Sequence, residues 1–148
     1  MKTIGNLFLT LLLICSCASK PINKYEKVGD HQLRSGWWEE QFDSDEGVLA
    51  ARGKYRMGER TGIWKWTLDG KKYQKDVIRK NIISTKFYYP SGKIMSKGHS
   101  RTEISDQERF WYYSGTWEFY DERGRLTHTK NYIKGHKMDS VYAGRPSK

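Results

Sequence analysis

Short stretches of alternating apolar and polar residues fill the chain between residues 36 and 141. Trp64, Trp66 and Leu68 are separated by single polar residues, the period of two that a half-buried β-strand requires. A continuous aromatic run at 110–113 predicts a strand that is covered on both sides or lies at a packing junction. We therefore predict that the chain is built from β-strands.

Glycine turns separate these stretches, and an aromatic residue precedes each turn. Around Pro90 and Gly92, proline fixes φ near about −65° and glycine accepts a positive φ, which predicts a three-residue hairpin loop. Asp43 and Asp121 are expected to cap their turns with side-chain oxygens. The strands are thus predicted to form hairpins that turn at four glycines: Gly47, Gly70, Gly92 and Gly124.

A Gly-x-Trp tripeptide begins three of the four hairpins, at 36–38, 62–64 and 115–117. A second frame, Tyr-x-x-Gly, recurs at 55–58 and 132–135 and predicts a tight turn between successive hairpins. Single hairpins are only marginally stable. We therefore expect neighbouring hairpins to bury each other's aromatic faces.

The third copy departs from this frame. Ser84, Thr85 and Lys86 stand where the other copies have Gly-x-Trp. A polar insertion at 100–108 then precedes the next aromatic strand. We expect this insertion to be a longer hairpin loop or a stretch of irregular register.

Together, Gly-x-Trp, the aromatic strand, the glycine turn and Tyr-x-x-Gly resemble the MORN-type repeat, over residues 36–141. The closer resemblance is to the MORN variant of bacterial lipoproteins and of proteins labelled YwqK-like antitoxins. The resemblance implies an all-β fold, an elongated antiparallel meander of stacked β-hairpins. It places a single repeat domain at 35–142, after an N-terminal signal segment.

The N-terminus has the form of a secretory signal. Lys2 precedes a mostly apolar run at 4–14, which is too short for the about 20 apolar residues of a membrane span. The run ends in a sequence that resembles a bacterial lipobox, because the small residue Ser16 precedes Cys17. We predict lipidation of Cys17; the alternative is a plain signal peptide with incidental cysteines.

This interpretation divides the chain into a signal segment at 1–17, a flexible tether at 18–34, the repeat domain and a disordered tail at 143–148. Ala18 after the acceptor implies, by the same resemblance, sorting to the outer membrane. The following residues are not acidic, so the periplasmic face is expected and surface display stays open. If the signal segment is cleaved before Cys17, the mature chain has no other cysteine, so no disulfide bond within it is expected.

The chain carries a net charge of +10, which attracts polyanions. In an exported protein, lipid head groups, lipopolysaccharide and cell-wall polymers are the expected anionic partners, and nucleic acid is not. Since the basic residues are spread along the sequence, we favour the interpretation that they keep an aromatic-rich sheet soluble.

Catalysis and metal binding find little support in the sequence. The histidines are isolated from one another, so neither a metal nor a cofactor is expected. Glu103, Asp106 and Glu108 lie close together in the insertion, and a solvated loop is favoured over an acid–base pair or a calcium site. We predict that the protein is not an enzyme.

Aromatic residues beside basic ones remain as candidates for binding sugars or anionic groups. The tryptophans of the repeat frame, Trp38, Trp64 and Trp117, are assigned to the core. The candidate binding residues are Trp37, Arg60, Arg109, Trp111 and Tyr112.

These features predict a lipid-anchored envelope protein with a non-enzymatic binding or scaffolding role. Its partner would be an envelope protein, a polysaccharide or an anionic lipid. The alternative is an antitoxin or immunity-type protein that masks a toxin. A third hypothesis is a hydrolase of envelope polymers that uses the acidic residues at 103–108.

Overall fold

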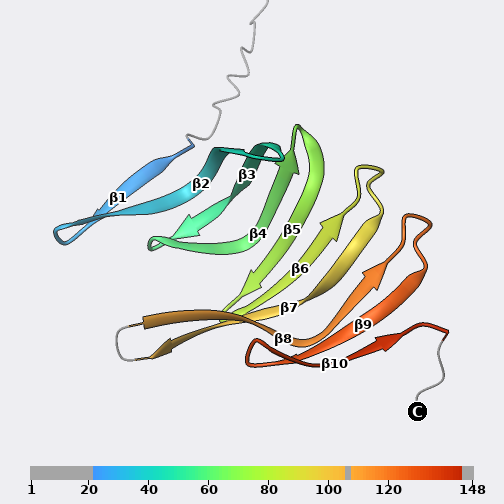
Figure 1. Cartoon of the computed structure of the whole chain (residues 1–148). Helices are drawn as coiled ribbons and strands as arrows, with labels where there is room; N and C mark the ends of the chain where they lie inside the picture. The colour runs from blue at the N-terminus through green and yellow to red at the C-terminus, as the bar shows by residue number, and fades with distance from the viewer. Residues whose placement is uncertain (1–21, 106–107, 145–148) are drawn as a thin grey trace, which may run out of the picture.

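The computed structural model describes residues 22–105 and 108–144, which form a single antiparallel sheet of ten strands (Figure 1). Each strand pairs with its neighbour in sequence, so the sheet is a meander and the all-β prediction is confirmed. The strands are β1 Lys24–Val28, β2 His31–Ser44, β3 Gly47–Arg56, β4 Glu59–Leu68, β5 Lys71–Arg79, β6 Ile82–Tyr88, β7 Ile94–Ser105, β8 Glu108–Tyr120, β9 Leu126–Ile133 and β10 His136–Tyr142.

The predicted turn chemistry is present at the hairpins. The Gly92 N–H donates to the Tyr89 carbonyl at 2.8 Å, and Gly92 has a φ of 83°, as the three-residue loop requires. Asp121 caps its turn by accepting backbone N–H bonds at 3.0 and 2.9 Å. At the first turn the side-chain bond comes from Ser44, which donates to the Gly47 carbonyl, in place of the expected Asp43 cap.

The predicted tether at 18–34 is wrong from Lys24 onward. Residues 24–28 form β1, which pairs with residues 31–35 of β2. Tyr25 of β1 packs its ring edge against Trp38 at 5.1 Å, so this extra hairpin covers an indole that would otherwise face solvent. The signal segment with Cys17, the first part of the tether and residues 145–148 of the tail lie outside the described residues.

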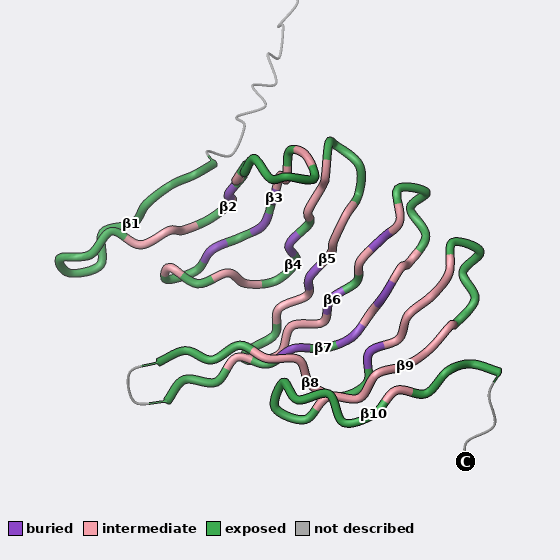
Figure 2. The backbone as a smooth tube through the Cα atoms, in the orientation of Figure 1, coloured by how far each residue is buried: buried purple, intermediate pink, exposed green. Residues whose placement is uncertain are grey.

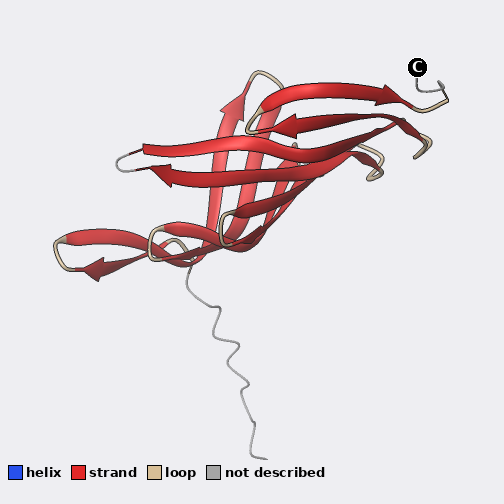
Figure 3. Cartoon of the chain, turned by 90° about the horizontal axis from the view of Figure 1, so that it is seen from below, coloured by secondary structure: helices blue, strands red, loops and turns tan. Residues whose placement is uncertain are grey.

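The described residues of the insertion, 100–105 and 108, are strand residues and form neither a loop nor a stretch of irregular register. Residues 100–105 continue β7 and residue 108 starts β8, and the pairing stays in register to Ser105 opposite Glu108. Figure 3 shows this hairpin running out beyond the neighbouring strands. Phe110 and Trp111 lie on its projecting part and are 48% and 55% exposed, so the expectation of a covered aromatic strand is wrong for them.

Two of the core tryptophans, Trp64 and Trp117, lie on glycines of the preceding strand. A Cβ atom added at Gly53 would stand 2.2 Å from the ring of Trp64, and the same holds for Gly98 and Trp117. The Trp64 indole N–H donates to the Lys54 carbonyl at 3.2 Å. Both glycines sit at β-bulges in their strands, so each indole covers bare backbone.

These rings join in edge-to-face contacts along one side of the sheet. Tyr55 bridges Trp38 and Trp64, with ring centroids 5.5 and 5.1 Å apart. At the other end, Trp117 packs against Tyr113 at 4.6 Å. The three frame tryptophans are at most 5% exposed, which confirms their assignment to the core. Figure 2 shows the buried residues in the middle of the strands, with exposed hairpin ends.

A candidate binding groove at the third hairpin

The hairpin β5–β6 breaks the pattern of tryptophan on glycine. In β3–β4 and in β7–β8, two residues pair directly across the hairpin. The glycine follows the first of these two residues in sequence, and the tryptophan precedes the second. The corresponding pair in β5–β6 is Lys75 with Lys86. Asp76 therefore takes the place of the glycine, and Thr85 takes the place of the tryptophan. The expected alignment of Ser84-Thr85-Lys86 with Gly-x-Trp is wrong by one residue, because the register puts Thr85 rather than Lys86 at the indole position.

Asp76 is a buried carboxylate, 8% exposed, that is held by neutral donors. The hydroxyl of Thr85 donates to Oδ1 at 2.8 Å, and the indole of Trp66 donates to Oδ2 at 3.1 Å. The Gln74 amide donates to both oxygens at 3.0 and 2.9 Å. These four bonds use the two oxygens of Asp76 as acceptors for neutral side-chain donors.

Ser100 of β7 also lies beside the groove but differs from Asp76 in its hydrogen bonding. Its side chain is fully buried, and its hydroxyl has no hydrogen-bond partner among the described residues. A buried hydroxyl without a partner is rare in folded proteins. The Ser100 hydroxyl therefore has hydrogen-bonding capacity that the described residues do not use.

A groove of about 750 Å³ opens beside these residues, on the face of the sheet that holds the core. A threonine and an aspartate fill less space than an indole, which accounts for the opening at this hairpin. Trp66 of β4 stands on one side, and Trp111 on the projecting part of β8 stands on the other. The groove is also lined by Tyr55, Gln74, Ile78, Lys80, Asn81, Ile83, Thr102 and Ile104.

An ion pair joins the two sides of the groove. Arg109 of β8 and Glu59 of β4 make two parallel contacts, at 2.5 and 2.6 Å, although they lie 50 residues apart in sequence. The hydrogen bond from Arg109 holds the pKa of Glu59 below its usual range and raises the pKa of Arg109. Both side chains are half exposed, so the contact is weak enough to open.

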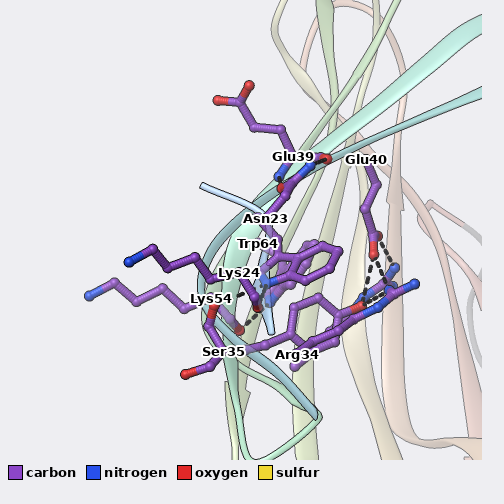
Figure 4. A network of polar contacts seen from close by, with 11 residues as sticks. Asn23, Lys24, Arg34, Ser35, Glu39, Glu40, Lys54 and Trp64 are labelled. Carbon is purple, nitrogen blue, oxygen red and sulfur yellow. Dashed lines mark hydrogen bonds and ion pairs between the residues drawn. The ribbon is translucent and has the colours of Figure 1, made fainter. Parts of the chain in front are cut away.

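A second charged group fixes the wall beside Trp66. Glu40 accepts hydrogen bonds from Arg34 and Arg60, each at 2.5 Å, and from the Tyr55 hydroxyl at 2.9 Å (Figure 4). The guanidinium of Arg60 lies 5.0 Å from the Trp66 ring centroid. Glu40 thereby holds Arg60 over the aromatic wall, where its guanidinium makes a cation–π contact.

The structure brings together three of the five predicted binding residues. Arg60, Arg109 and Trp111 line the same groove. Trp37 and Tyr112 do not line it. Trp37 lies under Lys54, 4.9 Å from its ring centroid, and Tyr112 donates its hydroxyl hydrogen bond to Glu103.

Sequence reasoning missed the polar residues of the groove. Asp76 and Thr85 carry a detectable signal, because they occupy the repeat positions that elsewhere hold glycine and tryptophan. Ser100 carried none, since a single serine inside a polar stretch looks like a loop residue. Its burial depends on the continued pairing of β7, which the sequence did not indicate.

Two histidines, His99 and His128, have structural partners. His99 contacts the Ser84 hydroxyl at 3.0 Å. His128 is stacked on Phe119 at 4.5 Å, and burial lowers its pKa. Within residues 22–105 and 108–144, no group of three or more His, Cys, Asp or Glu side chains is placed to hold a metal ion. The same residues contain no helix that is long and apolar enough to cross a membrane.

Comparison with known proteins gives no match: no family model, no curated protein and no solved structure resembles this chain. The resemblance to MORN-variant repeats therefore stays a prediction from the sequence motifs. The function of the groove has to be inferred from its own chemistry.

Proposed function

We propose that this protein is a non-enzymatic binding module, anchored in the cell envelope by a lipid on Cys17, and that its groove binds a glycan segment. One observation carries the proposal. The third hairpin replaces the tryptophan and glycine of its neighbours with Thr85 and Asp76, and a groove lined by both polar and apolar side chains lies there. A repeat that loses its core ring at one hairpin gains a site at the same place.

The lining suits a polyhydroxylated ligand. Trp66 and Trp111 present aromatic surface on two sides, against which the apolar faces of sugar rings pack. Sugar hydroxyls both donate and accept hydrogen bonds. The amides of Gln74 and Asn81, which line the groove, match that dual character.

The same groove is poorly arranged for hydrolysis. A glycosidase uses two carboxyl groups that exchange protons or attack the sugar. In this groove Asp76 is already bound by three neutral side chains, and Glu59 is bound by Arg109. Carboxylates held in this way support recognition of a ligand better than acid–base chemistry.

The predicted lipid anchor on Cys17 limits how far the sheet can lie from the membrane. A fully extended chain spans at most about 3.5 Å per residue, so the segment between Cys17 and Lys24 reaches about 25 Å. A module tied so closely to a membrane would meet the glycans of the envelope, peptidoglycan and lipopolysaccharide. Replacing Cys17→Ala is expected to move the protein from the membrane fraction to the soluble envelope fraction; an unchanged distribution would remove the anchor from the proposal.

Glycan binding is tested by calorimetric titration of the purified protein with muropeptides and with lipopolysaccharide core oligosaccharides. Trp111→Ala is expected to weaken binding about tenfold or more, the loss for an aromatic contact worth roughly 1.4 kcal/mol. Trp37→Ala is the matched control, because Trp37 does not line the groove, and it should bind as the wild type does. The glycan proposal fails if neither glycan binds, or if both variants lose affinity equally. If another protein instead cross-links to position 111 and stays bound during purification, that result would support the alternative function of masking a toxin.

A further inference from the structure

The face of the sheet opposite the groove carries a single file of basic residues. Consecutive strands place them directly opposite one another, Arg52 with Lys65, Lys65 with Lys75, Lys75 with Lys86, and Lys86 with Lys97. Side chains alternate between the two faces of a strand. Because each of these residues is the sequence neighbour of a core or groove residue, all five point away from the groove. We call these five residues the lysine ladder.

Acidic partners stand only at the two ends of the lysine ladder within the described part of the chain. Arg52 pairs with Glu39 at 3.1 Å, and Lys97 pairs with Glu118 at 3.1 Å. Figure 4 shows the Glu39 side chain pointing away from Glu40, which serves the other face. No ion pair among residues 22–105 and 108–144 involves the central rungs, Lys65, Lys75 and Lys86.

Three uncompensated cations in direct register oppose folding, because like charges directly across a sheet repel. Acidic residues pair with the two end cations of the row, but none lies between the three central lysines. The row is therefore a continuous line of positive charge on the surface of the sheet. Such a line is complementary to an extended polyanion.

We propose that the lysine ladder binds an acidic polysaccharide that lies across the strands. Neighbouring strands are about 4.8 Å apart, so the five cations form a line roughly 19 Å long with one charge per strand. A polymer with one carboxylate or phosphate on each unit would place anions at similar intervals. This second site is independent of the groove, because it lies on the other face of the sheet.

Two other polyanions fit the row less well. Proteins that bind single-stranded nucleic acid interleave their cations with aromatic platforms for the bases. Among the described residues, aromatic rings contact only the end cations of the lysine ladder, Trp37 beside Arg52 and Tyr120 beside Lys97, and no aromatic residue stands between the paired cations. A bilayer presents anions over a plane, whereas these five cations follow one another in a line, one on each of five adjacent strands.

The test compares two triple variants with the same net charge. K65Q/K75Q/K86Q removes the central rungs, and K27Q/K71Q/K93Q removes three exposed lysines elsewhere. Sodium polygalacturonate, which carries one carboxylate per sugar, is the probe. K65Q/K75Q/K86Q is expected to bind at least tenfold more weakly, and its slope of log affinity against log salt should fall by roughly 2, by analogy with single-stranded polyanions. K65R/K75R/K86R should bind as the wild type does.

Further measurements make the result decisive. The melting temperature of K65Q/K75Q/K86Q should equal or exceed that of the wild type, because the substitutions remove repulsion. An equal loss of affinity in K27Q/K71Q/K93Q would overturn the proposal, since net charge alone would then explain binding. It would also be overturned if the wild type binds poly(dT) or phosphatidylglycerol vesicles but not the polysaccharide.

Discussion

The hairpins β3–β4 and β5–β6 align through the pairs Arg52–Lys65 and Lys75–Lys86, but only β3–β4 has a bulge beside its pair, and the two hairpins differ in what fills the space above them. In β3–β4, Trp64 lies on Gly53 and is fully buried. In β5–β6, Thr85 lies at the same position, bonded to Asp76, and a groove opens beside them. In a repeat protein each unit contacts mainly its neighbours. Hairpins with a core tryptophan on both sides can therefore stabilise a hairpin that lacks one. A repeat unit that lacks a core residue found in its neighbours is therefore a place to look for a ligand-binding site.

The largest effect is expected from removing a core indole. Trp64→Ala should cost about 3–5 kcal/mol of unfolding free energy, because the ring has no exposed surface and its removal leaves a cavity on bare backbone. Trp111→Ala should change stability by less than about 0.5 kcal/mol, since that ring is more than half exposed. Urea unfolding of both variants measures the contrast. Similar costs would mean that the groove wall is part of the core.

A somewhat smaller cost should follow from adding a methyl group beneath the indole. Gly53→Ala places a Cβ atom 2.2 Å from the Trp64 ring and should cost at least about 1–3 kcal/mol by overpacking. The cost should largely vanish in the Trp64→Ala background, because the methyl group then has room. A double-mutant cycle on unfolding free energies shows the coupling. A cost that persists without the ring would assign the glycine to backbone conformation.

Restoring the frame at the third hairpin tests the comparison in the other direction. Thr85→Trp alone should destabilise the protein by about 1–3 kcal/mol, because the Asp76 side chain stands where the other units have glycine. D76G/T85W should recover most of that loss, since glycine leaves space for the indole. Thermal unfolding of the single and double variants gives the coupling. Additive effects would show that β5–β6 is not a modified copy of β3–β4.

The smallest effect concerns the ion pair across the groove. Arg109 lowers the pKa of Glu59, so the contribution of this carboxylate is present above its unfolded pKa and is lost as pH falls through the lower folded value. The pair is exposed and is worth at most about 1 kcal/mol. A side-chain NMR titration should find the pKa of Glu59 below its usual range in the wild type and close to that range in Arg109→Ala. An unchanged pKa in the variant would mean that the two groups are not paired in solution.

Local chemistry made much of the fold predictable from the sequence. The turns depend on residues such as Pro90, Gly92 and Asp121 within the turn itself, and the frame tryptophans recur at readable intervals. The glycines under the indoles were not predicted, because each lies in another strand and its role depends on a bulge. The lysine ladder was also missed, since its residues gather only when the strands are in register.

The groove was half predictable for a related reason. Arg60, Arg109 and Trp111 stood out as cations beside exposed aromatic residues. Asp76 did not, because the assumed alignment of the third repeat placed Lys86 instead of Thr85 at the indole position. A single residue of register exchanges the two faces of a strand, so this small shift concealed the polar lining.

The central claim is that the missing indole of the third hairpin creates the binding groove. Titrating D76G/T85W with the glycan that the wild type binds tests it directly, with the melting temperature as the check on folding. We expect a folded double variant whose affinity is at least about tenfold lower, because the new indole fills the space of the ligand. A folded double variant that binds with wild-type affinity would contradict it.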